Sequence, residues 1–158
     1  MNTEKGSGSK HKPIRIISIG GYYEYPKFLK AAVSEMSGFS LRFWSSTCLN
    51  NGLNYLAENE ADVIILDLDL PDSKGVNTFM RVRGLVPEIP IIVITSRENE
   101  EMSWRVIKEG AQDYIFRSQF RPSLLMRSLL YVVEKRGWEQ YVRGGTAAAN
   151  PAVPLPGA

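Results

Sequence analysis

The chain has 158 residues, which suits one domain with a core large enough to fold without a disulfide or a structural metal. Its formal net charge of +2, with 44% hydrophobic and 23% charged residues, is ordinary for a globular protein and gives no reason to expect nucleic acid or an anionic membrane as a partner. The single cysteine excludes an internal disulfide, and because the sequence has neither an apolar run of ~20 residues nor a secretory signal pattern, we predict a cytoplasmic protein that does not span a membrane.

Both ends of the chain have the composition of tails. Residues 1–12 are rich in Gly, Ser and Lys and have little to bury, and residues 141–158 are rich in Gly, Ala and Pro without a hydrophobic period. We therefore predict a disordered N-terminal tail over 1–12, one folded domain over 13–140, and a tail or linker over 141–158.

Within the predicted domain, short apolar runs alternate with stretches of helical spacing. The predicted elements, in chain order, are strand 14–19, helix 26–36, strand 41–45, helix 49–59, strand 62–68, helix 76–86, strand 89–96, helix 100–110, strand 113–117 and helix 122–136. The runs VIILDL and PIIVIT are apolar on both faces, which is typical of strands covered by helices on both sides. The pattern predicts an α/β domain with a doubly wound, five-stranded parallel sheet flanked by five helices.

In a sheet of this kind, the ligand crevice lies at the carboxyl ends of the strands, near the switch in strand order. The residues that end the first, third, fourth and fifth predicted strands are Gly20-Gly21, Asp67 to Asp69, Thr95-Ser96 and Arg117. We therefore expect these residues to meet at one edge of the sheet.

Three segments resemble the receiver domains of two-component response regulators. The segments DVIILDLDLPDSKG, IPIIVITS and EGAQDYIFRSQFRPSLLMRSL are similar to the third strand, the fourth strand, and the final strand and helix of that family. The similarity has the family's order and spacing over nearly all of the predicted domain. It implies a flavodoxin-like fold and a role in two-component signal transduction or a phosphorelay.

The resemblance also assigns roles to single residues. Asp67 matches the family's phosphoacceptor aspartate, and Thr95 matches the hydroxyl residue that moves onto the phosphoryl group. Tyr114 matches the aromatic residue whose rotation accompanies that move. From the residue pattern alone, Thr95 could equally close a strand and Tyr114 could equally pack at a sheet edge.

Two positions depart from the family pattern. Gly20 and Gly21 stand where receivers carry the acidic pair that binds a divalent metal, and Arg117 stands where they carry a lysine. Arginine is not a neutral replacement, because its planar fork favours two oxygens whereas an ammonium is a movable point charge. Since Mg²⁺ needs protein carboxylates to hold it, we expect Mg²⁺ binding to be weak or absent, with no other metal or cofactor.

Without the acidic pair, the pocket is formally neutral, because Asp67 and Arg117 balance each other. We therefore predict a direct ion pair between these two side chains. Asp69 lies two positions after Asp67 and could either supply a second carboxylate at the pocket mouth or be a solvated loop acid.

These observations leave three functions open. The leading one is a pseudo-receiver, which signals by protein–protein contact without metal-dependent phosphorylation. The first alternative is a receiver that accepts phosphate on Asp67. The second is a flavodoxin-fold binder that holds a phosphate or flavin at the Gly20-Gly21 turn, beside Tyr22, Tyr23 or Tyr25. No nucleophile with an adjacent base stands out, so we predict that the protein is not an enzyme.

The expected partner is a signalling protein, either a histidine kinase or a downstream effector. Family members commonly signal through the face formed by the fourth helix, fifth strand and fifth helix, and the residues expected there are Trp104, Arg105, Lys108, Asp113 and Arg127. This face could also form a homodimer. A tryptophan on a helix is more often a core residue than an interface residue, so the position of Trp104 stays open at this stage.

Overall fold

The computed structural model describes residues 13–20, 27, 40–96 and 100–143. Its main sheet consists of β1 (Ile14–Ile19), β2 (Leu41–Ser46), β3 (Val63–Leu66), β6 (Ile91–Thr95) and β7 (Asp113–Phe116). All neighbouring strands are parallel, and the spatial order is β2-β1-β3-β6-β7. The strand order reverses at β1, so the predicted doubly wound, flavodoxin-like sheet is confirmed.

Four helices lie in the described part of the chain, namely α2 (Leu49–Glu58), α3 (Val76–Leu85), α4 (Glu100–Lys108) and α5 (Pro122–Arg143). The predicted helix over 26–36 falls almost wholly outside the described residues. A short hairpin of β4 (Asp69–Leu70) and β5 (Ser73–Lys74) was not predicted, and α5 continues beyond the predicted end at residue 136. None of the described helices is both long and apolar enough to cross a membrane.

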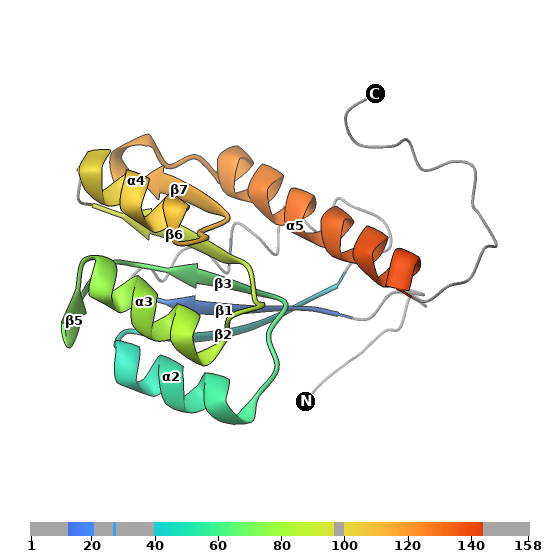
Figure 1. Ribbon diagram of the computed structural model, residues 1–158, viewed down its shortest axis with the longest axis horizontal. Coiled ribbons are helices and arrows are strands. Elements are labelled where there is room, and N and C mark those ends of the chain that lie inside the picture. Colours follow the sequence, from blue (N-terminus) through green and yellow to red (C-terminus); the bar gives the residue numbers. More distant parts are fainter. Residues whose placement is uncertain (1–12, 21–26, 28–39, 97–99, 144–158) are drawn as a thin grey trace.

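The sheet is covered on both faces (Figure 1), as its two-sided apolar strands require. One core contains Ile17, Ile19, Ile64, Leu66, Ile91 and Val93 of the strands, with Leu49, Leu56, Phe79, Val82 and Val106 of α2, α3 and α4. The other core contains Ile16, Val63, Ile65, Ile92, Ile94 and Ile115, with Leu125, Leu129 and Val132 of α5. Sequence neighbours such as Ile16 and Ile17 therefore belong to different cores.

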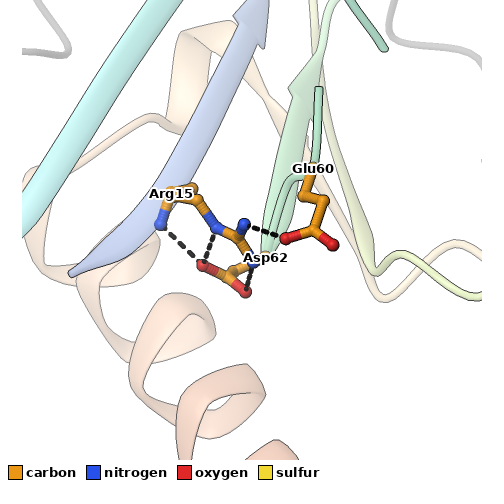
Figure 2. Close-up of polar contacts among 3 residues, drawn as sticks. All are labelled: Arg15, Glu60 and Asp62. Atoms are coloured by element: carbon orange, nitrogen blue, oxygen red, sulfur yellow. Dashed lines mark hydrogen bonds and ion pairs between the residues drawn. The ribbon is translucent and has the colours of Figure 1, made fainter. Parts of the chain in front are cut away.

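An ion cluster fastens the amino-terminal end of the sheet (Figure 2). The Arg15 side chain donates from Nε to Asp62 Oδ2 at 3.0 Å and from Nη2 to Asp62 Oδ1 at 3.1 Å, and it also pairs with Glu60. These partners raise the pKa of Arg15 above its ordinary value, led by the hydrogen bond to Asp62. The cluster joins the start of β1 to the residue before β3. It therefore lies at the edge of the sheet opposite the carboxyl ends of the strands, where the candidate site lies.

A second arginine, Arg83 of α3, links the loop after α3 to the turn after α4 by hydrogen bonds. The guanidinium of Arg83 donates to the carbonyl oxygens of Pro87 at 2.9 Å, Ile89 at 3.0 Å and Gly110 at 2.8 Å. Gly110 lies in the turn after α4, where its φ of +104° suits a glycine. Arg83 therefore holds the end of α4 to the loop between α3 and β6.

A pair of helical glycines, Gly52 in α2 and Gly84 in α3, provides a test of this packing. A Cβ at Gly52 would lie 2.4 Å from Cδ1 of Ile19, whereas a Cβ at Gly84 would meet nothing within 4 Å. We expect Gly52→Ala to lower the free energy of unfolding by ~1–3 kcal/mol through overpacking. Gly84→Ala should raise it by ~0.5–1 kcal/mol, because alanine favours a helix. Urea denaturation measures both, and equal effects would contradict the close approach of α2 to β1.

Candidate functional site

Asp67 lies at the carboxyl edge of the sheet, directly after β3. Its backbone N–H donates to the carbonyl of Ile19 at 2.8 Å, so the end of β1 lies beside it. The Asp67 side chain is only 8% exposed. Four core residues precede it in β3, so the strand carries this carboxylate to the edge of the apolar core.

Both carboxylate oxygens of Asp67 have partners. Oδ1 accepts the backbone N–H of Asp69 at 2.9 Å, and Oδ2 accepts a hydrogen bond from Nη2 of Arg117, which forms an ion pair with it. Arg117 opens the 3₁₀ turn Arg117–Gln119 that directly follows β7, and its side chain is 29% exposed. The ion pair predicted between Asp67 and Arg117 is therefore present.

Burial dominates the electrostatics of this aspartate. It raises the pKa of Asp67 above its ordinary value, although the N–H of Asp69 and the charge of Arg117 act in the opposite direction. The carboxylate is thus poorly solvated and depends on its protein partners for neutralisation.

Gly20 lies against Asp67 on the side of β1. Its φ is +152°, and a Cβ built on it would lie 2.7 Å from the Cβ of Asp67. Real Cβ atoms do not approach each other so closely, and L-residues rarely adopt this φ. An acidic side chain therefore cannot be placed at position 20 unless the backbone moves. Gly21 and the tyrosines Tyr22, Tyr23 and Tyr25 lie outside the described residues. The ligand site predicted at the Gly20-Gly21 turn therefore stays a prediction.

Asp69 lies in the β4–β5 hairpin, where it forms a solvent-exposed ion pair. Its Oδ1 accepts Nζ of Lys74 at 2.6 Å across the β4–β5 hairpin. Among the described residues, no three His, Cys, Asp or Glu side chains are grouped so that they could hold a metal ion. Asp67 and Asp69 are thus each paired with a cation, Arg117 and Lys74 respectively, which makes them a poor donor set for Mg²⁺.

Asp72 connects the loop after Asp67 to α2. Its Oδ1 and Oδ2 accept the backbone N–H groups of Leu49 and Asn50, each at 2.8 Å. These hydrogen bonds, led by that from Leu49, lower the pKa of Asp72. The sequence analysis missed this residue, because an N-cap normally stands directly before its own helix and leaves a local signal.

Thr95 and Tyr114 lie on the two last strands of the sheet. Thr95 ends β6 and is fully buried, and Tyr114 lies in β7, in register with Val93. Tyr114 packs against the core that includes Val106 of α4, and its ring meets that of Phe116 edge-on, with 5.3 Å between the ring centroids. Burial raises the pKa of Tyr114. Tyr114 therefore lies on the α4 side of the sheet.

The structure shows where the residues of the predicted signalling face lie. Trp104 is 75% exposed, so it is a surface residue rather than a core residue. Asp113 accepts Ser128 Oγ in a short hydrogen bond and the Tyr114 N–H at 2.8 Å. Asp113 and Arg127 also line a hollow of about 440 Å³, whose lining residues are Gln112, Asp113, Arg127, Ser128 and Tyr131.

The fold and site define a class of protein, namely a flavodoxin-like α/β domain with a buried aspartate at the carboxyl edge of its central strand. Comparison with protein families gives the particular family. The model of the response regulator receiver domain matches residues 27–129, well over half of the chain. The chain belongs to the response regulator receiver domain family.

The chain is also similar to two transcriptional regulatory proteins. The chain is 28% identical over 126 residues to the C4-dicarboxylate transport transcriptional regulatory protein DctD of Rhizobium meliloti (strain 1021), covering 78% of this chain and 27% of that protein. It is 34% identical over 89 residues to the KDP operon transcriptional regulatory protein KdpE of Escherichia coli (strain K12), covering 56% of this chain and 38% of that protein. The match thus spans less than two fifths of either relative.

Solved structures show the same fold. The chain resembles a response regulator receiver domain protein (CheY-like) from Methanospirillum hungatei JF-1, with a TM-score of 0.66, 19% identity, and coverage of 81% of this chain and 99% of that chain. It also resembles a two-component response regulator from Clostridium difficile, with a TM-score of 0.64, 19% identity, and coverage of 78% and 98%.

A double-mutant cycle tests the ion pair between Asp67 and Arg117. Arg117→Met leaves a buried carboxylate without its cation, and we expect it to lower the free energy of unfolding by ~3–5 kcal/mol at neutral pH. Asp67→Asn should cost less, because Arg117 is the more exposed partner. The double variant should lose ~0.5–3 kcal/mol less free energy of unfolding than the sum of the losses in the two single variants. The control Lys74→Met, which removes an exposed partner of Asp69, should cost less than ~1 kcal/mol.

The pH dependence of Arg117→Met follows from the raised pKa of Asp67. A raised pKa in the folded state gives stability that is complete below the unfolded value of about 3.9 and is lost as pH rises through the folded value. Loss of Arg117 should raise that pKa further. The deficit of the variant should therefore shrink as pH falls toward about 4. Additive single effects, or a deficit independent of pH, would show that the two side chains do not interact.

Asp72 should stabilise the folded state by capping the start of α2. We expect Asp72→Ala to lower the free energy of unfolding by ~0.5–2 kcal/mol, as for other helix caps. Because the folded pKa of Asp72 is lowered, its contribution is present above the ordinary carboxyl pKa and is lost as pH falls through the lowered value. Asp72→Asn should retain part of the cap without this pH dependence. Chemical denaturation of the three proteins between neutral and acidic pH measures the effect, and equal stability throughout would contradict the cap.

Proposed function

We propose that this receiver domain is a pseudo-receiver, which signals by protein–protein contact without Mg²⁺-dependent phosphorylation of Asp67. The observation that carries the proposal is the pairing of Asp67 with Arg117. Phosphoryl transfer to a carboxylate brings two anions together, and a receiver-type pocket relies on a metal and a cation to neutralise them. Here the aspartate is neutralised without a metal.

The surroundings of Asp67 support this proposal. One carboxylate oxygen accepts the Asp69 N–H and the other accepts Arg117, so attack on a phosphoryl group would first require these contacts to break. The backbone of Gly20 lies where an acidic side chain would have to start, and Asp69 is paired with Lys74. The donor set does not fit Mg²⁺, and we propose that the domain uses neither a metal nor another cofactor.

The proposal also concerns activity and partners. We propose that the domain is not an enzyme and that its partner is a protein, either a histidine kinase or an effector. The exposed Trp104 on α4 and the hollow that includes Arg127 and Tyr131 offer surface for such a contact. The transcriptional roles in the names of the relatives belong to proteins of which the match spans only a part, so the absence of nucleic-acid binding stays a prediction.

A second candidate function is a phosphorylatable receiver. The buried Asp67 is in the family's phosphoacceptor position, and the guanidinium of Arg117 is a cation within reach of any group attached to Oδ2. In this alternative, Arg117 would transfer its hydrogen bond from the carboxylate to the phosphoryl oxygens.

Incubation with a small-molecule phosphodonor and Mg²⁺, followed by intact mass measurement, separates the two functions. We expect no phosphate adduct on the parent chain, because Asp67 is paired with Arg117 and Gly20 supplies no carboxylate for a metal. A receiver domain with the acidic pair serves as the positive control. A stoichiometric adduct that disappears in Asp67→Asn would establish the second candidate instead.

A further inference from the structure

The hollow between the start of β7 and α5 has the size of a site for a small molecule. Its volume of about 440 Å³ falls within the range of ~300–1,000 Å³ that is typical of small-ligand sites. Asp113 begins β7, whereas Arg117 follows the end of that strand, so the hollow lies away from the candidate site at Asp67. Its chemistry is therefore independent of the ion pair at the carboxyl edge of the sheet.

The carboxylate of Asp113 is held in place within this hollow. One of its oxygens accepts the N–H of Tyr114 at 2.8 Å, and the other accepts the hydroxyl of Ser128, which is itself only 8% exposed. A carboxylate has about four lone-pair sites, so Asp113 can still accept hydrogen bonds from a ligand. It is a fixed acceptor in the lining of the hollow.

Three further side chains of the lining are available to a ligand. Among the residues that the structure describes, the side chains of Gln112, Arg127 and Tyr131 make no hydrogen bond or ion pair. Arg127 and Tyr131 are four positions apart on α5, so they lie on the same face of the helix, about 6 Å apart at Cβ. Tyr131 is 56% exposed. The hollow thus offers a cation, an aromatic ring, an amide and a fixed carboxylate.

We propose that this hollow binds a mononucleotide, with its phosphate at Arg127 and its base at Tyr131. A guanidinium binds phosphate oxygens through two parallel hydrogen bonds, and a tyrosine ring stacks on a base. The amide of Gln112 can donate to and accept from the edge of a purine. A fixed aspartate commonly accepts the hydroxyl groups of a ribose, so Asp113 favours a nucleotide over an aromatic acid, which lacks those donors.

Such a ligand would give the domain an input that does not involve Asp67. A bound nucleotide would cover Arg127 and Tyr131, which the hollow otherwise offers to a protein partner. Occupancy would then change the contact surface without a phosphoryl group on the aspartate. This regulatory role rests on the proposed function, whereas binding in the hollow does not.

Calorimetric titration of the full chain with adenosine monophosphate (AMP) tests the site. We expect one AMP per chain, with a Kd on the order of 10 µM to 1 mM for an open hollow of this size. Arg127→Gln and Tyr131→Ala should each weaken binding by at least ~tenfold. The matched controls Arg121→Gln and Trp104→Ala change an exposed arginine and an exposed aromatic residue outside the hollow, and both should bind AMP like the parent. All four side chains are exposed, so the variants should keep the parent's circular dichroism.

Changes to the ligand test each contact without altering the protein. Adenosine lacks the phosphate, so it should bind more weakly than AMP and should be insensitive to Arg127→Gln. Ribose 5-phosphate lacks the base, so Tyr131→Ala should not weaken its binding further. The 2′,3′-dideoxy form of AMP lacks the hydroxyl groups assigned to Asp113, and it should bind more weakly than AMP. Inorganic phosphate shows whether a phosphate alone binds, for example at Arg117.

The outcomes are distinct. Absence of AMP binding at ~5 mM, or equal binding by Arg127→Gln and Arg121→Gln, would overturn the site. So would AMP-induced shifts of backbone amide resonances that centre on Asp67 and Arg117 instead of Gln112 and Ser128. Equal binding of the dideoxy nucleotide would overturn the role of Asp113 and the preference for a nucleotide. None of these results bears on the pseudo-receiver function, which the phosphodonor experiment tests separately. A phosphate adduct on Asp67 would overturn the regulatory role alone.

Discussion

The structure at the carboxyl edge of the sheet depends on one interaction, the ion pair between Asp67 and Arg117. It joins the end of β3 to the turn after β7, across the intervening strand β6, and it neutralises a carboxylate that burial has removed from water. The rest of the edge is arranged around it. The N–H of Asp69 occupies the other carboxylate oxygen, and the backbone of Gly20 closes the side on which an acidic pair would stand. In the proposed function, the guanidinium of Arg117 takes the place of a metal ion that would have to bind from solution.

Two further contacts stabilise the same edge, and a third contact, farther away, holds the end of α4. Asp72 ties the loop after Asp67 to the start of α2, and Lys74 closes the β4–β5 hairpin onto Asp69. Farther from the site, Arg83 holds the turn after α4 to the loop that follows α3. Through the contacts of Arg83, the C-terminal end of α4 has a defined position relative to α3. A partner that binds α4 would therefore meet a surface that is already formed.

Much of this architecture could be predicted from the sequence, for identifiable reasons. The runs VIIL and IIVIT are buried on both faces, so their lack of alternation indicated a parallel sheet covered on both sides. Because topology brings the ends of β3 and β7 to one edge, the pairing of Asp67 with Arg117 could also be inferred. The approach of Gly20 to Asp67 could not, since it depends on a backbone angle and on the path of β1. Nor could the cap by Asp72, which lies 23 residues from its partner Leu49 in sequence. The exposure of Trp104 was undecided because apolar spacing alone does not say which side of a short helix faces the sheet.

The conformation of Gly20 has a consequence for the history of this domain. Its φ of +152° and its approach to the Cβ of Asp67 mean that the acidic side chain typical of the family no longer fits at this position. A single reversion to an acidic residue would meet a steric barrier before it could bring any benefit in metal binding. The backbone would have to move first, and that movement would disturb Asp67 and its bond to Ile19. Under the proposed function, one point mutation would therefore not be enough to build a metal site of the family type here, and further change of this sequence is biased toward functions that operate without the metal.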